Sequence, residues 1–297
     1  MVSAPRSVTV GQLVQLGAAA FEDAGLWFEH GNDNPLDEAA ELVFFGADLR
    51  HEDAESVYDC VLHEQQRERI LQLFERRIQE RVPAAYLTHR MWFAGHEFYV
   101  DDRVLVPRSP IAELIEARFE PWIDATRIRR VLDIGTGSGC IAIAAALALP
   151  IASVDAADVS KDALAVAAIN IDRYRLQSRG RAFRSDVFDA LAGERYDVIV
   201  SNPPYVGDAE LASLPAEYSR EPRMGLHGGS DGLQIVDRIL QQAREHLTSE
   251  GILIVEVGNS DEALIAAYPR VPFTWLEFER GGGGVFVLTA EELKAMR

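Results

Sequence analysis

From residue 129 onward, short apolar segments alternate with longer helical segments, and this alternation restricts the fold more than any other feature of the sequence. Short strands separated by helices predict a mostly parallel, doubly wound α/β sheet. The last two strands are joined by only Gly281–Gly284, which is too short for a parallel crossover, so this terminal pair is predicted to be antiparallel. The predicted strands are 131–134, 154–159, 182–188, 197–201, 251–257, 273–279 and 285–288, and the predicted helices are 139–149, 162–176, 232–248 and 261–267.

The first 85 residues follow a different pattern, because their apolar residues recur at the three- and four-residue spacing of amphipathic helices. Thr9 followed by Gln12 resembles a capping box. Asn34 before Pro35 marks the start of a second helix. This region is therefore predicted to form a small helical domain.

Between these two regions the texture changes again. Aromatic and β-branched residues at 86–88, 91–93 and 98–100 surround a glycine and predict a hairpin. Two prolines then stiffen a linker before a helix over 111–119. The predicted division is a helical domain over 1–84, a hairpin and linker over 85–110, and an α/β domain over 111–297.

Charge and composition exclude several classes of protein. The 29 basic and 47 acidic residues give a formal net charge of −18, and no run of Lys or Arg occurs, so no direct binding to nucleic acid is expected. This charge favours either solubility alone or attraction to a basic protein partner. No apolar stretch reaches the roughly 18 residues of a membrane span, so no membrane association is expected. Two cysteines and seven scattered histidines show no metal-ligand spacing, and no secretory signal is visible, which predicts a cytoplasmic protein without a metal.

The first predicted strand of the α/β domain runs into a loop with glycines at 135, 137 and 139. Glycine lets a backbone turn tightly where a ligand lies against it. In open α/β sheets, ligands bind at the carboxyl ends of the strands beside the topological switch point. The spacing is GxGxG, which departs from the GxGxxG fingerprint of dinucleotide sites.

Acidic residues at the ends of successive strands suggest which ligand this loop binds. Asp158, about 20 residues after the glycines, is placed to bind ribose hydroxyls, with Asp155 as a less favoured alternative. Asp186, at the end of the third strand, could accept a hydrogen bond from an adenine amino group. Asp133 would repel a pyrophosphate and attract a sulfonium with an ammonium group. The acids thus favour S-adenosylmethionine over NAD.

The fourth strand ends in Asn202-Pro203-Pro204-Tyr205, the most informative tetrapeptide in the chain. The two prolines stop the strand and stiffen the loop. The Asn202 side-chain carbonyl and the Pro203 backbone carbonyl then become two fixed acceptors, which match the two donors of a planar NH₂ group. Tyr205 supplies a flat face for stacking. This turn predicts catalysis of methyl transfer to an amide or amine nitrogen, because accepting both hydrogens orients the nitrogen toward the methyl group.

These residues resemble a known family, the protein-glutamine N5-methyltransferases, a group of class I (Rossmann-like) S-adenosylmethionine enzymes. The chain is most similar to the branch that acts on ribosomal protein L three of the large subunit. The resemblance covers essentially the whole chain, including the helical domain. The motifs that carry it are LDIGTGSGCIAIA (132–144), VDAADVSKDAL (154–164), SDVF (185–188), SNPPYV (201–206), EVGNS (256–260), the segment 85–115, HGGSDGL (227–233) and 271–289.

The resemblance implies a role for individual residues. It implies that the methionine end of the cofactor is lined by Asp133, Gly135, Thr136, Gly137 and Gly139. It further implies that Asp158 holds the ribose, that Asp186 and Val187 hold the adenine, and that Asn202 lies against both cofactor and substrate. Asn202, Pro203, Pro204 and Tyr205 would hold the glutamine side chain, while the helical domain would recognise the protein substrate.

Three charged residues near the linker and the catalytic turn have weaker interpretations. Arg108 is expected to stabilise the domain junction rather than to touch the cofactor. Glu217 and Glu221 are expected to be solvated, although they could meet a basic substrate.

Four alternatives to the L three assignment remain open from the sequence. The same tetrapeptide is compatible with glutamine methylation of peptide chain release factors and with amino-methylation of a nucleic-acid base. A catalytically silent Rossmann-type binding module and an NAD oxidoreductase are the other two, and the second is the least favoured.

Overall fold

The computed structural model describes residues 2, 4–28, 30–50 and 54–296, which form two compact units. The helical unit consists of Met1–Met91 with Pro215–Arg220, and the sheet unit consists of Trp92–Leu214 with Glu221–Arg297. The predicted division was linear along the chain. The segment Pro215–Arg220, which follows the catalytic turn in sequence, instead clusters with the helices.

The sheet unit contains a seven-stranded sheet in the order β5-β4-β3-β6-β7-β9-β8. The strand order changes direction between β3 and β6, so a switch point lies between these parallel neighbours. β9 runs antiparallel to both β7 and β8. The predicted fold class, with seven strands and an antiparallel terminal pair, is confirmed. The strands are β3 Arg130–Ile134, β4 Ser153–Asp158, β5 Gly180–Arg184, β6 Tyr196–Ser201, β7 Leu247–Glu256, β8 Thr274–Trp275 and β9 Val285–Thr289.

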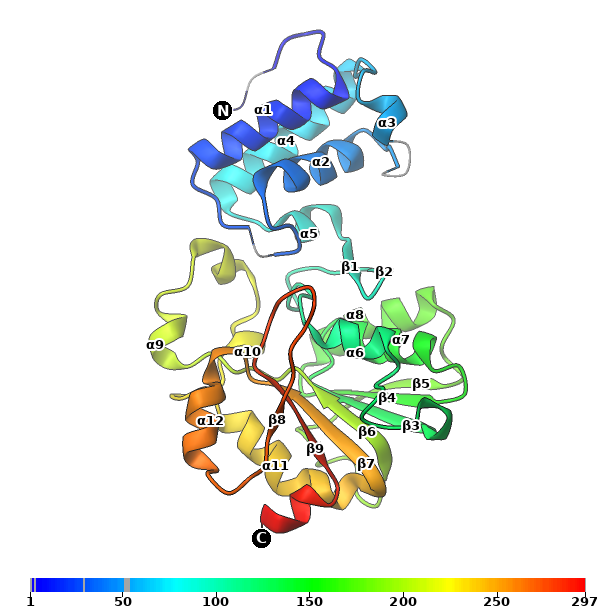
Figure 1. The fold of residues 1–297 in the computed structure, drawn as a ribbon. Helices are drawn as coiled ribbons and strands as arrows, with labels where there is room; N and C mark the ends of the chain where they lie inside the picture. Colours follow the sequence, from blue (N-terminus) through cyan, green and yellow to red (C-terminus); the bar gives the residue numbers. More distant parts are fainter. Residues whose placement is uncertain (1, 3, 29, 51–53, 297) are drawn as a thin grey trace. The chain divides into compact units, whose positions relative to one another are not determined.

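Helices cover both faces of this sheet (Figure 1). Alternate residues of a strand point to opposite faces, so Val131 packs into one core with α6 and α7, while Leu132 packs into the other with α11 and α12. Burial on both faces explains why the central strands β6 and β7 are largely apolar, whereas the edge strand β5 is not. The covering helices are α6 Ile111–Glu116, α7 Cys140–Ala148, α8 Lys161–Arg173, α11 Gln234–His246 and α12 Asp261–Ala267.

Shorter elements complete the sheet unit. The hairpin expected after the helical domain is a two-stranded sheet formed by β1 and β2. The remaining elements are β1 Met91–Phe93, β2 His96–Phe98, the helices α9 Asp208–Leu211 and α10 Arg223–Leu226, and the 3-10 turns η2 Ala125–Arg127, η4 Gly258–Ser260 and η5 Glu292–Met296.

The helical unit is built around the amphipathic helices that the sequence predicts. Thr9 and Gln12 form the capping box of α1, and the Asn34 side chain caps α2. Phe21 and Phe74 meet edge to face in the core, with ring centroids 5.2 Å apart. The helices are α1 Val10–Asp23, α2 Pro35–Gly46, α3 Ala54–Val57, α4 Glu64–Glu80 and α5 Ala84–Thr88, and η3 Ala216–Arg220 joins them from the distant segment.

A buried charged cluster lies inside the helical unit. The Arg77 side chain is fully buried, and its Nε lies 2.5 Å from Oε1 of Glu38. Its Nη1 lies 3.2 Å from Oε1 of Glu217, and its Nη2 donates to the Trp27 carbonyl over 2.7 Å. The expectation that Glu217 is solvated was therefore wrong, because its carboxylate is buried and forms an ion pair with the buried Arg77 guanidinium.

Three predicted elements differ from the structure. Residues 86–88, predicted as part of the hairpin, lie in α5. The strand predicted over 182–188 ends at Arg184, so Asp186 lies in the loop beyond β5. The strand predicted over 273–279 is reduced to the two residues of β8, which lies at the sheet edge and pairs with β9.

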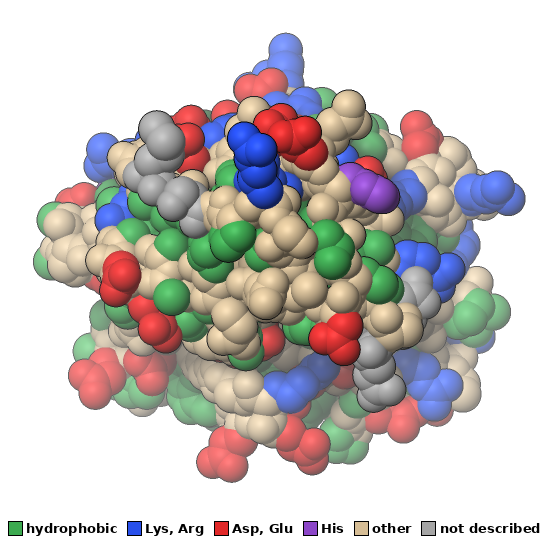
Figure 2. Space-filling model, turned by 90° about the horizontal axis from the view of Figure 1, so that it is seen from above, with side chains coloured by type: hydrophobic (Ala, Val, Ile, Leu, Met, Phe, Trp, Pro, Cys, Tyr) green, Lys and Arg blue, Asp and Glu red, His purple; other side chains and the backbone are tan. Residues whose placement is uncertain are grey.

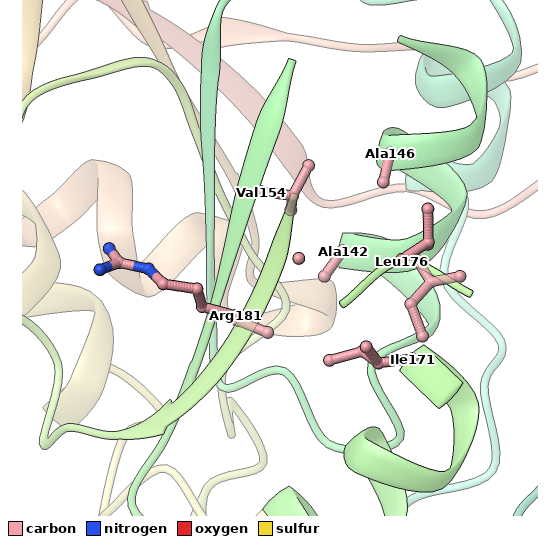
Figure 3. A pocket seen from close by; sticks show the side chains of 9 residues that line it. Ala142, Ala146, Val154, Ile171, Leu176 and Arg181 are labelled. Atoms are coloured by element: carbon pink, nitrogen blue, oxygen red, sulfur yellow. The ribbon is translucent and has the colours of Figure 1, made fainter. Parts of the chain in front are cut away.

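A small cavity in the sheet unit is lined mainly by aliphatic side chains of α7, α8 and β4 (Figure 3). Its volume is about 10 Å³, close to the minimum for one water molecule, and the Arg181 guanidinium points away from it. It is a packing void and not a ligand site. Within the described ranges, none of the helices has the length and apolar character needed to cross a membrane.

Candidate functional site

Two turns that the sequence predicts as functional lie side by side at the carboxyl edge of the sheet. Strands β3 and β6 pair in parallel with Ile134 opposite Ser201, so the glycine turn and the Asn202 turn leave the sheet at neighbouring points. The Ser201 hydroxyl donates to the Ile134 carbonyl over 2.7 Å and ties the strand ends together. A Cβ at Gly135 would lie 3.9 Å from the Asn202 carbonyl oxygen. The two turns are therefore direct neighbours at the switch point.

The glycine turn depends on a left-handed backbone. Gly135, Gly137 and Gly139 have φ values of 72°, 55° and 81°. Other residues adopt such values only at a cost of about 1–2 kcal/mol each. The turn delivers the chain directly into the N-terminus of α7.

Asp133 lies beneath this turn with one oxygen occupied. Its Oδ2 accepts from Thr136 Oγ1 over 2.5 Å and from the Ala142 amide over 3.2 Å. Its Oδ1 is buried and has no hydrogen-bond partner among the described residues. Burial raises the pKa of Asp133 to about 7. A buried acceptor without a donor fits a cationic amine, so this residue matches the ammonium end expected of the cofactor.

The unusual environment of Asp133 has a measurable consequence for stability. Its pKa is raised in the folded state, so its contribution to stability is greatest below pH 3.8 and is lost as the pH rises toward 7. We expect Asp133→Asn to become progressively more stable than the parent between pH 5 and 7, by at most about 1.4 kcal/mol per pH unit. Urea unfolding at several pH values measures this difference, with the exposed Asp189→Asn as the matched control. A stability difference that is constant with pH would contradict the prediction.

Asp158 lies at the end of β4 and supports the glycine turn. Its Oδ2 accepts from the Gly137 amide over 2.9 Å, and its Oδ1 accepts from the Ser160 amide over 2.8 Å. Burial raises its pKa. The less favoured alternative, Asp155, is held by Tyr196 and by two arginines, so it lies outside the group of residues around the two turns.

The two residues expected at the adenine differ in their exposure. Asp186 is exposed, and its Oδ1 lies 2.8 Å from Nη1 of Arg238 on α11. Val187 is buried and has a φ of 53°, which is rare for a β-branched residue. Such local strain is found where surrounding structure over-determines a conformation, often at binding sites.

The Asn202-Pro203-Pro204-Tyr205 turn is held in place by contacts with its carboxyl-terminal residues. Pro203 is buried, and the Tyr205 carbonyl accepts from the Ser260 hydroxyl over 2.9 Å. Val206 forms a bridge to His227, at the start of the HGGSDGL segment. That segment packs so closely that a Cβ at Gly228 would lie 2.5 Å from the Pro204 carbonyl oxygen. The carboxyl-terminal part of the turn is therefore closely packed.

One substitution tests this close packing. A Cβ at Gly232 would lie 2.1 Å from the Tyr205 carbonyl oxygen, at a φ of 80°. We expect Gly232→Ala to lower the free energy of unfolding by about 3 kcal/mol, through backbone strain and overpacking. Gly193→Ala is the matched control, because φ is 82° there and nothing lies within 4 Å, so only about 1 kcal/mol should be lost. Equal losses would show that the contact with the turn costs nothing.

A residue that sequence reasoning did not assign completes the site. Glu256, the last residue of β7, is buried, and its Oε1 accepts from the Tyr205 hydroxyl over 3.0 Å. Its Oε2 accepts from the Ser109 hydroxyl over 2.5 Å. The available signal was its place in the EVGNS motif, since an acid that ends a buried strand needs partners.

The linker is anchored to the sheet unit by a second acid. The Arg108 guanidinium makes a bidentate pair with Glu221, with both N···O distances 2.7 Å. Glu221 also accepts from the Val106 amide over 2.9 Å. Both residues belong to the sheet unit, so the pair fixes the linker within that unit. The expectation that Glu221 is solvated was wrong, because its carboxylate is buried against the linker.

Comparisons with known proteins complement this geometry. Residues 119–215, which contain both turns, match the family model described as Methyltransferase small domain. The chain is 49% identical over 287 residues to the ribosomal protein uL3 glutamine methyltransferase of Xanthomonas campestris pv. campestris, covering 97% of this chain and 93% of that protein. It is 50% identical over 287 residues to the protein of the same name from Xylella fastidiosa, covering 97% and 92%. Among solved structures, a T. Thermophilus 16S rRNA methyltransferase in complex with AdoMet and guanosine aligns with a TM-score of 0.48 and 18% identity over 67% of this chain and 49% of that chain.

Proposed function

This chain belongs to the family of ribosomal protein uL3 glutamine methyltransferases, and from that premise we propose that it methylates the side-chain amide nitrogen, N5, of a glutamine in ribosomal protein uL3. It is a methyltransferase that uses S-adenosylmethionine as its methyl donor. The product would be N5-methylglutamine.

The observation that carries the proposal is the pairing of the two turns at the switch point. Strand neighbours β3 and β6 present the glycine turn and the Asn202 turn to one space. Asn202 and Pro203 would accept the two hydrogens of the substrate carboxamide through their side-chain and backbone carbonyls. Tyr205 would lie against the flat face of the amide.

This arrangement addresses the main chemical difficulty of the reaction. An amide nitrogen is a poor nucleophile, because its lone pair is delocalised into the carbonyl. Two fixed acceptors orient the nitrogen and return electron density to it. They also stabilise the positive charge that develops on nitrogen as the methyl group arrives. The methylated nitrogen then becomes acidic enough to lose its proton without a strong base.

The cofactor residues are proposed on the fit of their polar groups. Asp133, with its unpartnered Oδ1, would accept from the cofactor ammonium, next to the backbone of Gly135, Thr136, Gly137 and Gly139. Asp158 would bind the ribose, which requires its carboxylate to share or release the Gly137 amide. When bound, the cofactor supplies the methyl group on a sulfonium centre.

The adenine end would rest on two further residues. Asp186 would accept from the adenine amino group with the oxygen that Arg238 leaves available, or after that ion pair opens. Val187 would contribute its backbone and apolar surface from its left-handed conformation.

Charge supports a protein substrate over a nucleic acid. The net charge of −18 would attract a basic protein and repel phosphate. On the face that Figure 2 shows, acidic and basic side chains are interspersed, with no continuous basic patch. Residues 1–84 would recognise uL3, and an enzyme that modifies a ribosomal protein would act in the cytoplasm.

The test is transfer of a labelled methyl group to purified uL3, to a release factor and to ribosomal RNA. We expect label in uL3 only, and mass spectrometry should locate it on a glutamine side chain. Label confined to the release factor would show that the proposed substrate is wrong and that the proposed reaction, methylation of a glutamine, still holds. Label confined to RNA would overturn the proposal.

A further inference from the structure

Glu256 is a buried carboxyl group in direct contact with the proposed substrate-binding turn. Only 4% of its surface is exposed, and its two oxygens accept from two hydroxyls, those of Tyr205 and Ser109. Ser109 is itself fixed, because its Oγ also accepts from the Ile111 amide over 3.2 Å. A single acid thus joins the turn after β6, the end of β7 and the linker before α6.

The contact fixes the orientation of one aromatic ring. The chain passes directly beside the ring of Tyr205 at Gly258, where a Cβ would lie 2.4 Å from the ring carbon Cε2. Gly258 therefore limits the ring on one side, and the hydrogen bond to Glu256 holds its hydroxyl end. The side-chain torsions of Tyr205 therefore have little freedom to change.

Stability alone does not explain a carboxyl group in this position. Burying a charge is costly unless it is paired, and apolar replacements of similar size are often equally stable. The Arg108 guanidinium, which pairs with Glu221, acts on Glu256 through a longer-range electrostatic attraction. Burial accordingly raises the pKa of Glu256 to about 7. A costly group that contacts a functional ring is better explained by control of that ring.

We propose that Glu256 is a positioning residue for methyl transfer, which holds the hydroxyl of Tyr205 and thereby sets the angle at which the ring lies against the acceptor carboxamide. This inference rests on the proposed function of the Asn202 turn. It adds a residue that acts through Tyr205 and does not touch the substrate.

The role depends on the protonation state of the carboxyl group. An ionised Glu256 accepts from both hydroxyls, whereas a protonated one must use one oxygen as a donor. The groups that face it are Tyr205, Ser109 and the more distant Arg108. The turnover number should therefore increase with pH through about 7, as the arrangement with two accepted hydrogen bonds becomes dominant. The pKa of Asp133 is also raised to about 7, so Asp133 contributes to the same pH dependence of kcat. The contribution of Glu256 is the part of this pH dependence that Tyr205→Phe removes.

A double-mutant cycle tests the coupling. We expect Glu256→Gln to lower kcat roughly 10-fold with little change in KM for uL3, which corresponds to about 1.4 kcal/mol of transition-state stabilisation. In a Tyr205→Phe background the same substitution should have almost no further effect, because the hydroxyl that it controls is gone. Additive losses in kcat would overturn the inference.

A second measurement reports on the contact without requiring activity. With tyrosines labelled by carbon-13 at Cζ, the signal that Tyr205→Phe removes should shift between pH 6 and 8 in the parent and stay constant in Glu256→Gln. A matched control is the buried pair of Tyr196 and Asp155, in which the Tyr196 hydroxyl donates to Asp155 Oδ2 over 2.8 Å. Tyr196→Phe should leave the pH dependence of kcat unchanged.

The two failures are distinguishable. A parent enzyme that does not methylate uL3 contradicts the proposed function, and the Tyr205 signal then decides whether Glu256 holds the ring. A Tyr205 signal that does not respond to Glu256→Gln overturns the positioning role, whatever the activity.

Discussion

Asn202→Ala should reduce kcat for methyl transfer by about 10²–10³-fold while leaving the fold intact. The substitution removes one of two fixed carbonyl acceptors, and loss of a single preorganised hydrogen-bonding group of this kind has an effect of that size. Cofactor affinity should fall by at most about 10-fold, since at most one hydrogen bond to the cofactor is lost. Labelled methyl transfer to uL3 and calorimetric titration with S-adenosylmethionine measure the two quantities separately.

Gln177→Ala is the matched control for this result. Gln177 has an exposed carboxamide and lies just before the amino end of β5. The Asn202 turn, in contrast, follows the carboxyl end of the parallel strand β6. The Gln177 side chain donates to Asp172, near the end of α8, over 2.7 Å. Its removal should leave kcat unchanged. Substantial methylation by Asn202→Ala would contradict the proposed role of the turn.

Arg77→Ala should destabilise the helical unit by about 3–5 kcal/mol. The substitution leaves Glu38 buried without its cation, and breaking a buried ion pair in this way is among the largest penalties that a single substitution can cause. Glu217 also loses Arg77 but keeps its pair with Arg81, whose Nη1 lies 3.3 Å from Oε1 of Glu217. The substitution also removes the donor to the Trp27 carbonyl. Urea unfolding followed by far-ultraviolet circular dichroism should show an earlier transition for this helix-rich unit.

Arg76→Ala provides the comparison one residue away on the same helix. The Arg76 side chain is 52% exposed and pairs with Glu80 four residues later. Such surface pairs contribute about 0.3–0.5 kcal/mol, so the unfolding transition should hardly move. Similar losses for the two variants would mean that the buried cluster contributes no more than a surface pair.

The sequence was sufficient to predict the sheet and the two turns. Local chain geometry determines the spacing of apolar residues, the spacing of the glycines and the short Gly281–Gly284 connection. Each of these can be recognised from the order of residues in the sequence. Asp133 and Asp158 could likewise be placed, since acids at the ends of parallel strands meet at one edge of the sheet.

The remaining features could not be predicted because they depend on distant partners. Glu217 and Glu221 look solvated in sequence, yet Arg77 and Arg108 lie 140 and 113 residues away along the chain. Glu256 lies in a recognisable motif, but nothing in the sequence indicates that the hydroxyls of Tyr205 and Ser109 donate to it. The 86–88 segment was predicted as extended from its composition, and packing of α5 against the other helices outweighed that preference.

The grouping of Pro215–Arg220 with the helices has a consequence for the order of events during translation. Helices α1 to α5 leave the ribosome first, but the carboxylate of Glu217 that completes their interior follows only after β3 to β6 have been synthesised. Until then the guanidinium of Arg77 has only the carboxylate of Glu38 to offset its charge. We therefore expect the N-terminal part of the nascent chain to reach its full stability only after the segment Pro215–Arg220 has been synthesised.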